Sequence, residues 1–131
     1  MTTSKPAGSP KARILVVDDT PDNLFLMSAL LEDQFDVVTA ENGVDALRLA
    51  QSQQAPDLIL LDIMMPHVSG LDVLAELRQI PHRSATPVIM LTAKGHETDR
   101  EQAASLGATD FLTKPFSPKK LLARIDELFS S

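Results

Sequence analysis

Polar side chains that can bind cations or phosphate follow four strand-like runs of this chain. They are Asp18 and Asp19 after residues 14–17, Asp62 after 58–61, Thr92 and Ala93 after 88–91, and Lys114 after 109–113. Short apolar runs of this kind are best buried as strands covered on both faces. An ionised side chain at the mouth of such a core is rarely left without a partner. We therefore expect these side chains to meet, with the carboxylate of Asp62 at the centre.

Three carboxylates that lie close together repel one another, because all are ionised at pH 7 when their pKa values are ordinary. A cation must compensate them, or one must bind a proton. Mg²⁺ is the natural cation, since it prefers oxygen ligands and often completes its shell with phosphate oxygens; Mn²⁺ is a plausible substitute. The chain has no Cys, and no His adjoins Asp18, Asp19 or Asp62, which argues against zinc and copper.

Lys114 adds a second cation to this expected site. A carboxylate beside two cations can attack phosphorus, because the cations neutralise the transferring oxygens. The hydroxyl of Thr92 and the backbone N–H of Ala93 could bind the remaining oxygens. Each residue alone also has an ordinary interpretation, since Asp and Thr are frequent in turns and helix starts and Lys is usually solvated. Turn chemistry does not explain why all of them should follow strands of one sheet.

Five strand-like runs alternate with five helix-like segments. Alternation of this kind predicts βαβ units with right-handed crossovers and a parallel sheet. The strands are expected at 14–17, 37–40, 58–61, 88–91 and 109–113. Asp36 and Thr39 favour an edge position for the second strand. The expected fold is therefore α/β, a doubly wound, flavodoxin-like (βα)5 sandwich of three layers with strand order 2-1-3-4-5, whose ligands bind outside the carboxyl ends of the strands.

Local signals mark the helix ends. Thr20-Pro21 and Ser117-Pro118 are typical of an N-cap followed by proline in the first helical turn. Ser69 can cap the third helix, and Asn42-Gly43 is expected to form a turn before the second. The polar segment 97–106 should be a helix that ends at Gly107.

Length and composition limit the remaining possibilities. The chain has 131 residues, enough for one domain with a core, of which 44% are hydrophobic. Residues 1–10 are expected to be a disordered tail and residues 11–131 the domain. The net charge of -6 argues against direct binding to nucleic acid. No apolar stretch approaches the roughly 20 residues that span a membrane, and no signal peptide is present, so a cytoplasmic protein is expected by elimination.

Four stretches resemble the receiver domain of bacterial two-component response regulators, of the chemotaxis-regulator-like kind. They are ILVVDD (14–19), LILLDIMMPHVSG (58–70), PVIMLTA (87–93) and GATDFLTKPF (107–116). The resemblance implies that Asp62 accepts a phosphoryl group from a phosphohistidine on a sensor histidine kinase or a phosphotransfer protein. It implies that Asp18, Asp19, Asp62 and the backbone carbonyl of Met64 hold Mg²⁺. It also implies that Thr92, Ala93 and Lys114 bind the phosphoryl oxygens, and that the Lys114–Pro115 peptide is usually cis, which the sequence cannot show.

The resemblance also suggests how such a domain switches. Thr92 is expected to move toward the phosphoryl group, and Phe111 to fill the space that Thr92 leaves. Met64 and Lys94 should flank the site and tune the lifetime of the phosphorylated state. Since Met cannot orient a hydrolytic water, the domain is expected to promote its own phosphotransfer and to lose the group slowly, over minutes or longer, rather than to act as an enzyme.

Three alternatives use the same fold or site. A haloacid-dehalogenase-like phosphatase needs a second Asp two residues after the nucleophile, where this chain has Met64. A flavodoxin-like flavin carrier needs aromatic rings, and the chain has no Trp or Tyr. The third alternative is an interaction module that works without phosphorylation, which the intact set of site residues argues against.

The output is not encoded in the expected domain. The chain ends at Ser131, directly after the last helix, so we expect either a stand-alone regulator with a downstream protein target or a fragment attached to an output domain. In the family, the fourth helix, fifth strand and fifth helix usually form the signalling face. Asp110 and Arg124 resemble part of the charge pattern of receivers that dimerise there on phosphorylation, whereas Lys120 stands where that pattern has an acidic residue.

Overall fold

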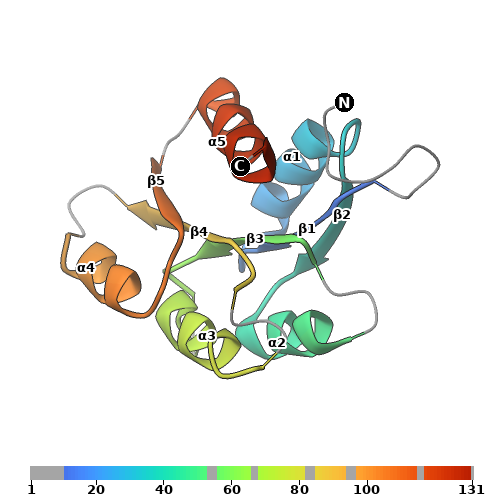
Figure 1. The fold of residues 1–131 in the computed structure, drawn as a ribbon. Helices are drawn as coiled ribbons and strands as arrows, with labels where there is room; N and C mark the ends of the chain where they lie inside the picture. Colours follow the sequence, from blue (N-terminus) through green and yellow to red (C-terminus); the bar gives the residue numbers. More distant parts are fainter. Residues whose placement is uncertain are drawn as a thin grey trace.

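Five parallel strands form one sheet at the centre of the molecule (Figure 1). The computed structural model describes residues 11–52, 56–65, 68–81, 85–93, 97–114 and 117–130. The strands are β1 (Arg13–Val17), β2 (Asp36–Ala40), β3 (Leu58–Asp62), β4 (Val88–Ala93) and β5 (Asp110–Lys114). Their order is β2-β1-β3-β4-β5. The predicted doubly wound topology and the edge position of β2 are confirmed.

Helices cover both faces of the sheet, as Figure 1 shows. They are α1 (Pro21–Leu31), α2 (Gly43–Gln51), α3 (Gly70–Leu77), α4 (Glu97–Ser105) and α5 (Pro118–Ser130). Helices α1 and α5 lie on one face, and α2, α3 and α4 lie on the other. None of the described helices is long and apolar enough to cross a membrane.

Strand β3 contributes side chains to both hydrophobic cores. Leu58 and Leu60 pack with α1 and α5, whereas Ile59 and Leu61 pack with α2 and α3. All four side chains are fully buried. A strand buried on both faces must be apolar at every position, which is why the run before Asp62 does not alternate. The two cores therefore fix the end of β3, and with it the position of Asp62.

The strands extend beyond the apolar runs that predicted them. Asp62, Thr92 and Lys114 belong to β3, β4 and β5 rather than to the loops that follow. The fifth strand begins at Asp110, one residue later than expected. Thr109 is nevertheless bound to β4 from both sides, because its N–H donates to the carbonyl of Val88 and its hydroxyl accepts from the Val88 N–H. The chemistry-bearing side chains thus project from hydrogen-bonded backbone.

The helix starts agree with the sequence signals in part. Ser69 caps α3, because its hydroxyl accepts from the N–H of Asp72. Thr20 occupies the N-cap position of α1 with Pro21 next to it, but its side chain makes no capping hydrogen bond. The turn expected at Asn42-Gly43 is wrong in its detail: Asn42 caps α2 and Gly43 is the first residue of that helix.

Helix α4 is weakly anchored along its length but firmly held at its end. Ala103 is its only buried residue. Gly107 ends the helical segment with φ at 96°, as expected of a glycine in the left-handed region. Arg78, at the end of α3, donates to the Gly107 carbonyl from Nη2 (2.7 Å) and Nε (3.2 Å) and to the Thr86 carbonyl from Nη1 (2.9 Å). Its guanidinium therefore ties the end of α4 to α3 and to the start of β4.

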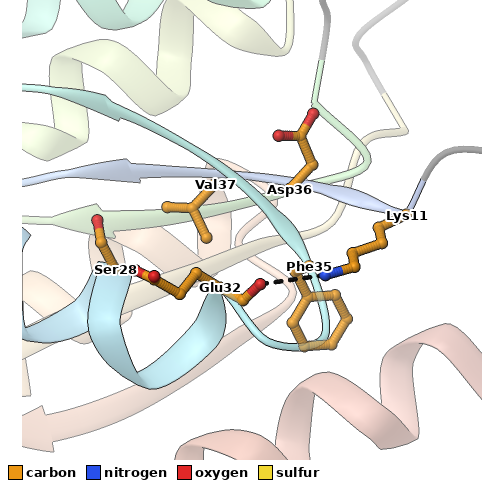
Figure 2. A pocket seen from close by; sticks show the side chains of 6 residues that line it. All are labelled: Lys11, Ser28, Glu32, Phe35, Asp36 and Val37. Atoms are coloured by element: carbon orange, nitrogen blue, oxygen red, sulfur yellow. Dashed lines mark hydrogen bonds between the residues drawn. The ribbon is translucent and has the colours of Figure 1, made fainter.

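A surface pocket of about 470 Å³ lies beside the starting ends of β1 and β2 (Figure 2). Lys11 reaches across it to the backbone carbonyls of Glu32 (3.3 Å) and Asp33 (2.9 Å). These carbonyls follow the last turn of α1, where a cation is favourable because the helix dipole is negative there. Lys11 is therefore committed to the end of α1, and we assign this pocket a structural role.

Candidate functional site

Three carboxylates meet at the carboxyl ends of β1 and β3. One carboxylate oxygen from each of Asp18, Asp19 and Asp62 lies within 4.8 Å of the others. Asp18 is 2% and Asp62 4% exposed. Strands β1 and β3 are neighbours, paired in register from Ile14 with Leu58 to Val17 with Leu61, so the residues that follow emerge side by side. The predicted acidic cluster is therefore present, at the edge where the strand order reverses.

Lys114 brings a positive charge to this cluster from the sheet edge strand. Its Nζ lies 3.0 Å from Oδ2 of Asp62 and 3.4 Å from Oδ2 of Asp18. Because β4 separates β3 from β5, the long side chain must pass the end of β4 to reach both carboxylates. Lys114 thus bridges the two buried carboxylates.

Burial and charge oppose each other at this site. Burial raises the pKa of Asp62 above its ordinary value, and Asp18 adds to this effect, while the hydrogen bond and charge of Lys114 and the N–H of Met64 lower it without cancelling it. Burial alone would lower the pKa of Lys114, but its hydrogen bond to Asp62 and the charges of Asp62 and Asp18 outweigh burial and raise it. The ammonium is therefore stabilised, whereas the Asp62 carboxylate is held at an energetic cost.

Hydrogen bonds orient the two buried carboxylates. Oδ1 of Asp18 accepts from the Thr20 N–H at 2.9 Å, and the side-chain amide of Asn23 lies 3.5 and 3.3 Å from its two oxygens. Oδ1 of Asp62 accepts from the Met64 N–H at 3.1 Å. Sequence reasoning did not single out Asn23. The signal that could have found it is its place in the first turn of the helix that follows Asp18.

Thr92 has a buried hydroxyl with no hydrogen-bond partner among the described residues. Its side chain is 1% exposed, and it stands next to last in β4. Because a buried unpaired hydroxyl is costly, it usually indicates a bound group or water that completes it. Ala93 ends β4 and pairs in register with Lys114. Lys94 and Pro115 lie outside the described residues.

Gly70 allows the backbone of α3 to approach Asp62. A Cβ on Gly70 would lie 2.2 Å from the Asp62 carbonyl oxygen and 2.8 Å from Cα of Ile63, and the Gly70 N–H donates to the Ile63 carbonyl at 2.9 Å. Real Cβ atoms do not tolerate contacts this short, so only glycine fits here. The sequence contains this glycine at the end of the motif around Asp62, but its role depends on a contact that the sequence does not show.

The two residues expected to switch or to rim the site lie around it. Phe111 is half-buried in β5, pairs in register with Met90, and has the guanidinium carbon of Arg100 at 5.2 Å from its ring centroid. The side chain of Met64 is 54% exposed. Phe111 packs against the core on the side of α2, α3 and α4, so its part in a switch stays a prediction, as does the effect of Met64 on lifetime.

The donor set suits a hard divalent cation. The acidic cluster contains carboxylate oxygens only, and the unpaired Thr92 hydroxyl is a further oxygen close to the same sheet edge. Mg²⁺ prefers oxygen ligands and keeps several waters. The residues present therefore fit Mg²⁺ and do not resemble a zinc or copper site.

A family model named "Response regulator receiver domain" matches residues 14–126. The chain belongs to this family. The match covers all five strands and the acidic cluster, so the flavin-carrier and haloacid-dehalogenase-like alternatives are replaced by the receiver assignment. An acidic pocket of this kind is typical of the phosphoacceptor site of response regulators.

Curated relatives and solved structures agree with the family. The receiver domain is 41% identical over 120 residues to protein PilH of Pseudomonas aeruginosa, which covers 91% of this chain and 98% of PilH. It is 48% identical over 114 residues to the transcriptional regulatory protein CpxR of Escherichia coli, covering 86% of this chain and 47% of CpxR. The chain thus spans nearly all of PilH but about half the length of most of the curated relatives compared.

Two solved receivers show the same fold closely. The chemotaxis protein CheY4 of Vibrio cholerae superposes with a TM-score of 0.83 at 32% identity, covering 89% of this chain and 98% of CheY4. The receiver domain of the sensor histidine kinase PA1611 of Pseudomonas aeruginosa gives 0.84 at 31% identity, covering 92% and 99%. That structure has a magnesium ion coordinated in its active site cleft.

Proposed function

We propose that this receiver domain accepts a phosphoryl group on Asp62 from a phosphohistidine of a sensor histidine kinase or a histidine phosphotransfer protein. The observation that carries the proposal is a buried carboxylate, at the carboxyl end of a central strand, with Lys114 Nζ at 3.0 Å and two further carboxylates beside it. Asp62 is the nucleophile because it alone of the three both contacts Lys114 closely and ends a strand covered on both faces.

The transfer exchanges one bond to phosphorus for another. An Asp62 oxygen attacks the phosphorus, the P–N bond to the donor histidine breaks, and the histidine nitrogen keeps the electron pair. Lys114, the Thr92 hydroxyl and the backbone N–H of Ala93 bind the phosphoryl oxygens as charge builds on them. The unpaired hydroxyl of Thr92 supports this role, since a phosphoryl oxygen would supply the missing partner.

Asp18, Asp19, Asp62 and the backbone carbonyl of Met64 would hold Mg²⁺. When bound, the ion neutralises carboxylate repulsion and the negative charge of the transferring oxygens. Mn²⁺ would serve as well, because it accepts the same oxygen ligands. The ammonium of Lys114 also neutralises part of the carboxylate charge, and hydrogen bonds from Asn23 and the Thr20 N–H keep Asp18 oriented.

Phosphorylation would be read out through Thr92 and Phe111. The added group carries about -1.5 to -2 charges at pH 7 and would draw the Thr92 hydroxyl toward it. Phe111 is half-buried and lies two residues before Thr113, which pairs in register with Thr92. It would turn inward into the space that Thr92 leaves. Phe111 keeping one rotamer with and without a phosphoryl mimic would contradict this switch.

The phosphorylated state is expected to be long-lived. The exposed thioether of Met64 can neither act as a base nor orient a water, and general-base catalysis contributes roughly 10²–10⁴-fold where it exists. We predict loss of the phosphoryl group over minutes or longer, measured by intact mass after removal of the donor. A half-life of seconds would show that another group, such as Lys94, assists hydrolysis.

The wider context of the domain follows the family. We infer a cytoplasmic location, a downstream protein target or an attached output domain, and no direct contact with nucleic acid. The disordered tail predicted at residues 1–10 lies outside the residues that the structure describes. Phosphorylation-dependent dimerisation stays a prediction, and Asp110 and Arg124, whose charges suggested it, form an ion pair of 2.5 Å within one chain.

Incubation with acetyl phosphate and Mg²⁺, read by intact mass, tests the proposal. The expected result is one phosphoryl adduct, lost with EDTA and absent in Asp62→Asn. Asp126→Asn is the matched control, because Asp126 is exposed on α5 and should leave the adduct unchanged. An adduct that persists in Asp62→Asn would show that another residue accepts the phosphoryl group. Steady release of phosphate from simple phosphomonoesters would favour a phosphatase.

A further inference from the structure

Helices α1 and α5 lie on the same face of the sheet, and a groove with a volume of about 900 Å³ lies between them (Figure 1). This volume is typical of small-molecule sites, which measure roughly 300–1,000 Å³. We call this surface the α1–α5 groove. Leu26 on its wall is 64% exposed, so a ligand can enter from solvent. Most of the lining residues are apolar: Leu26, Met27, Ala29 and Leu30 of α1, Leu91 of β4 and Pro118 of α5.

The polar end of the α1–α5 groove is the carboxylate site itself. Asp18, Asn23 and Lys114 complete its lining. Asp18 belongs to the acidic cluster, and Nζ of Lys114 lies 3.0 Å from Oδ2 of Asp62. A molecule with its polar head at these groups can therefore lay an apolar tail along the groove. Such a combination of an apolar cavity with a few convergent polar groups is characteristic of ligand sites.

We propose that the α1–α5 groove binds the acyl chain of an acyl phosphate, so that long-chain acyl phosphates are better phosphoryl donors to this domain than acetyl phosphate. The inference rests on the proposed function, because Asp62 must be the acceptor. An Asp62 oxygen attacks the phosphorus and the P–O bond to the acyl carboxyl group breaks. The carboxylate leaves with the electron pair, so the transfer needs no proton, oxidant or further reactant.

Charge selects an anionic head for this ligand. The ammonium of Lys114 lies at the polar end of the groove, and the three carboxylates there fit Mg²⁺, so phosphate oxygens have two cations to bind. The apolar wall selects the tail, because burial of methylene groups is favourable. An amine with an apolar tail is the competing ligand, since the carboxylates outnumber the one ammonium when no metal is bound. The experiment therefore includes both.

Donor preference is tested by intact mass on the full chain with Mg²⁺ and acetyl, butanoyl or hexanoyl phosphate, each below saturation. A buried methylene strengthens binding by about three- to fourfold, and binding of a remote group raises the second-order rate. Because the groove is open on one side, we expect hexanoyl phosphate to react about tenfold faster than acetyl phosphate. Hydrolysis of each donor in buffer corrects for its own reactivity. Equal corrected rates would overturn the proposal.

Two variants locate the preference, read as the ratio of the hexanoyl to the acetyl phosphate rate within each protein. Leu26→Gln should lower this ratio about threefold, because it makes one wall of the groove polar. Ala29→Trp should lower it to near one, because the indole occupies the groove. Phe25→Gln is the matched control: Phe25 is 73% exposed on the same helix but does not line the groove, so the ratio should stay unchanged. An equal fall in Phe25→Gln, or no fall in the other two, would overturn the proposal.

A binding measurement without transfer separates this inference from the proposed function. With Mg²⁺ present, hexylphosphonate should raise the melting temperature of the unmodified chain more than methylphosphonate or hexylamine does. A larger shift with hexylamine, or equal shifts with the two phosphonates, would overturn the proposed occupant of the groove. Adducts that form at equal corrected rates from all donors overturn the groove alone. Absence of an adduct from every donor overturns the role of Asp62 and the donor preference together.

Discussion

Thr92 is a residue where stability and function are expected to diverge. Its hydroxyl is buried without a partner among the described residues, and such a group costs about 1–3 kcal/mol. Thr109, which directly precedes the neighbouring strand β5, is the opposite case, because its hydroxyl accepts a hydrogen bond of 3.0 Å from the Val88 N–H. A threonine hydroxyl is therefore expected to cost stability at one end of β4 and to contribute stability at the other.

Thr92→Val is expected to raise the free energy of unfolding of the unphosphorylated domain by about 1 kcal/mol, since it replaces an unpaired hydroxyl with a methyl of similar shape. Thr109→Val should lower it by about 1 kcal/mol, since it leaves the Val88 N–H without its acceptor. Urea denaturation measures both. Destabilisation by Thr92→Val would mean that its hydroxyl has a partner in solution, such as a bound water.

Asp62 should make the stability of the domain depend on pH. Folding raises the pKa of Asp62 above 3.8, through burial first and then the charge of Asp18. The folded state therefore holds the proton more tightly than the unfolded state. The stability that this brings is fully present below pH 3.8 and is lost as pH rises through the raised pKa. At neutral pH the ionised carboxylate is a net cost to the fold, even with Lys114 beside it.

Asp62→Asn removes that cost. Without divalent cations at pH 7 the variant should melt a few degrees above the unmodified domain, and the gap should close as pH falls through the raised pKa of Asp62 toward 3.8. Mg²⁺ should raise the melting temperature of the unmodified domain more than that of the variant. Thermal melts across pH, with Asp126→Asn alongside, measure this. A gap that widens in acid would show that the sign of the pKa shift is wrong.

At the scale of elements, the contact between α3 and the end of β3 decides how Asp62 is held. Gly70 starts α3 against the Asp62 carbonyl, whereas Gly43 starts α2 against the side-chain methyls of Val68 and Val73. Both glycines are buried and crowded. The backbone of Asp62 next to Gly70 cannot rotate away from an added Cβ, whereas the valine methyl groups next to Gly43 can. This difference allows a matched test of two helix starts.

Gly70→Ala is expected to lower the free energy of unfolding by about 1–3 kcal/mol or more and to slow phosphorylation of Asp62, because the backbone that carries Asp62 must shift. Gly43→Ala should cost less and leave phosphorylation nearly unchanged, since Val68 and Val73 can adjust. Denaturation and adduct formation over time measure the two effects. Equal costs in both variants would mean that the tight approach at Gly70 is relieved by movement of the whole of α3.

The sequence predicts the elements well because period and burial are local signals. Runs such as 58–61 must be strands covered on both faces, and Gly107 must end a helix. It predicts the acidic cluster because parallel strands place Asp18 and Asp62 at the same edge. What it cannot predict depends on the packing of distant segments: the amide of Asn23 on Asp18, the approach of Gly70 to Asp62, and the path of Lys114 past β4.

At the scale of the whole molecule, the two ends of the sheet carry different kinds of contact. The carboxyl ends of the strands carry the acidic cluster, and the opposite end is closed by contacts such as that of Lys11 with the end of α1. A groove lined by Phe111 and Leu112 lies beside β5, the strand that also ends in Lys114. One edge strand therefore lies next to both the acidic cluster and this groove.

The hydrogen bonds of Arg78 to the Gly107 carbonyl anchor α4 at one end. The last residue of α4, Ser105, lies next to this contact with α3, while its first residue, Glu97, lies at the opposite end of the helix. Nine residues rising about 1.5 Å each give an arm of roughly 13 Å. A tilt of about 10° would then displace the start of the helix by roughly 2 Å while its end stays in place. Any tilt of α4 would therefore displace Glu97 and Arg100 more than Ser105.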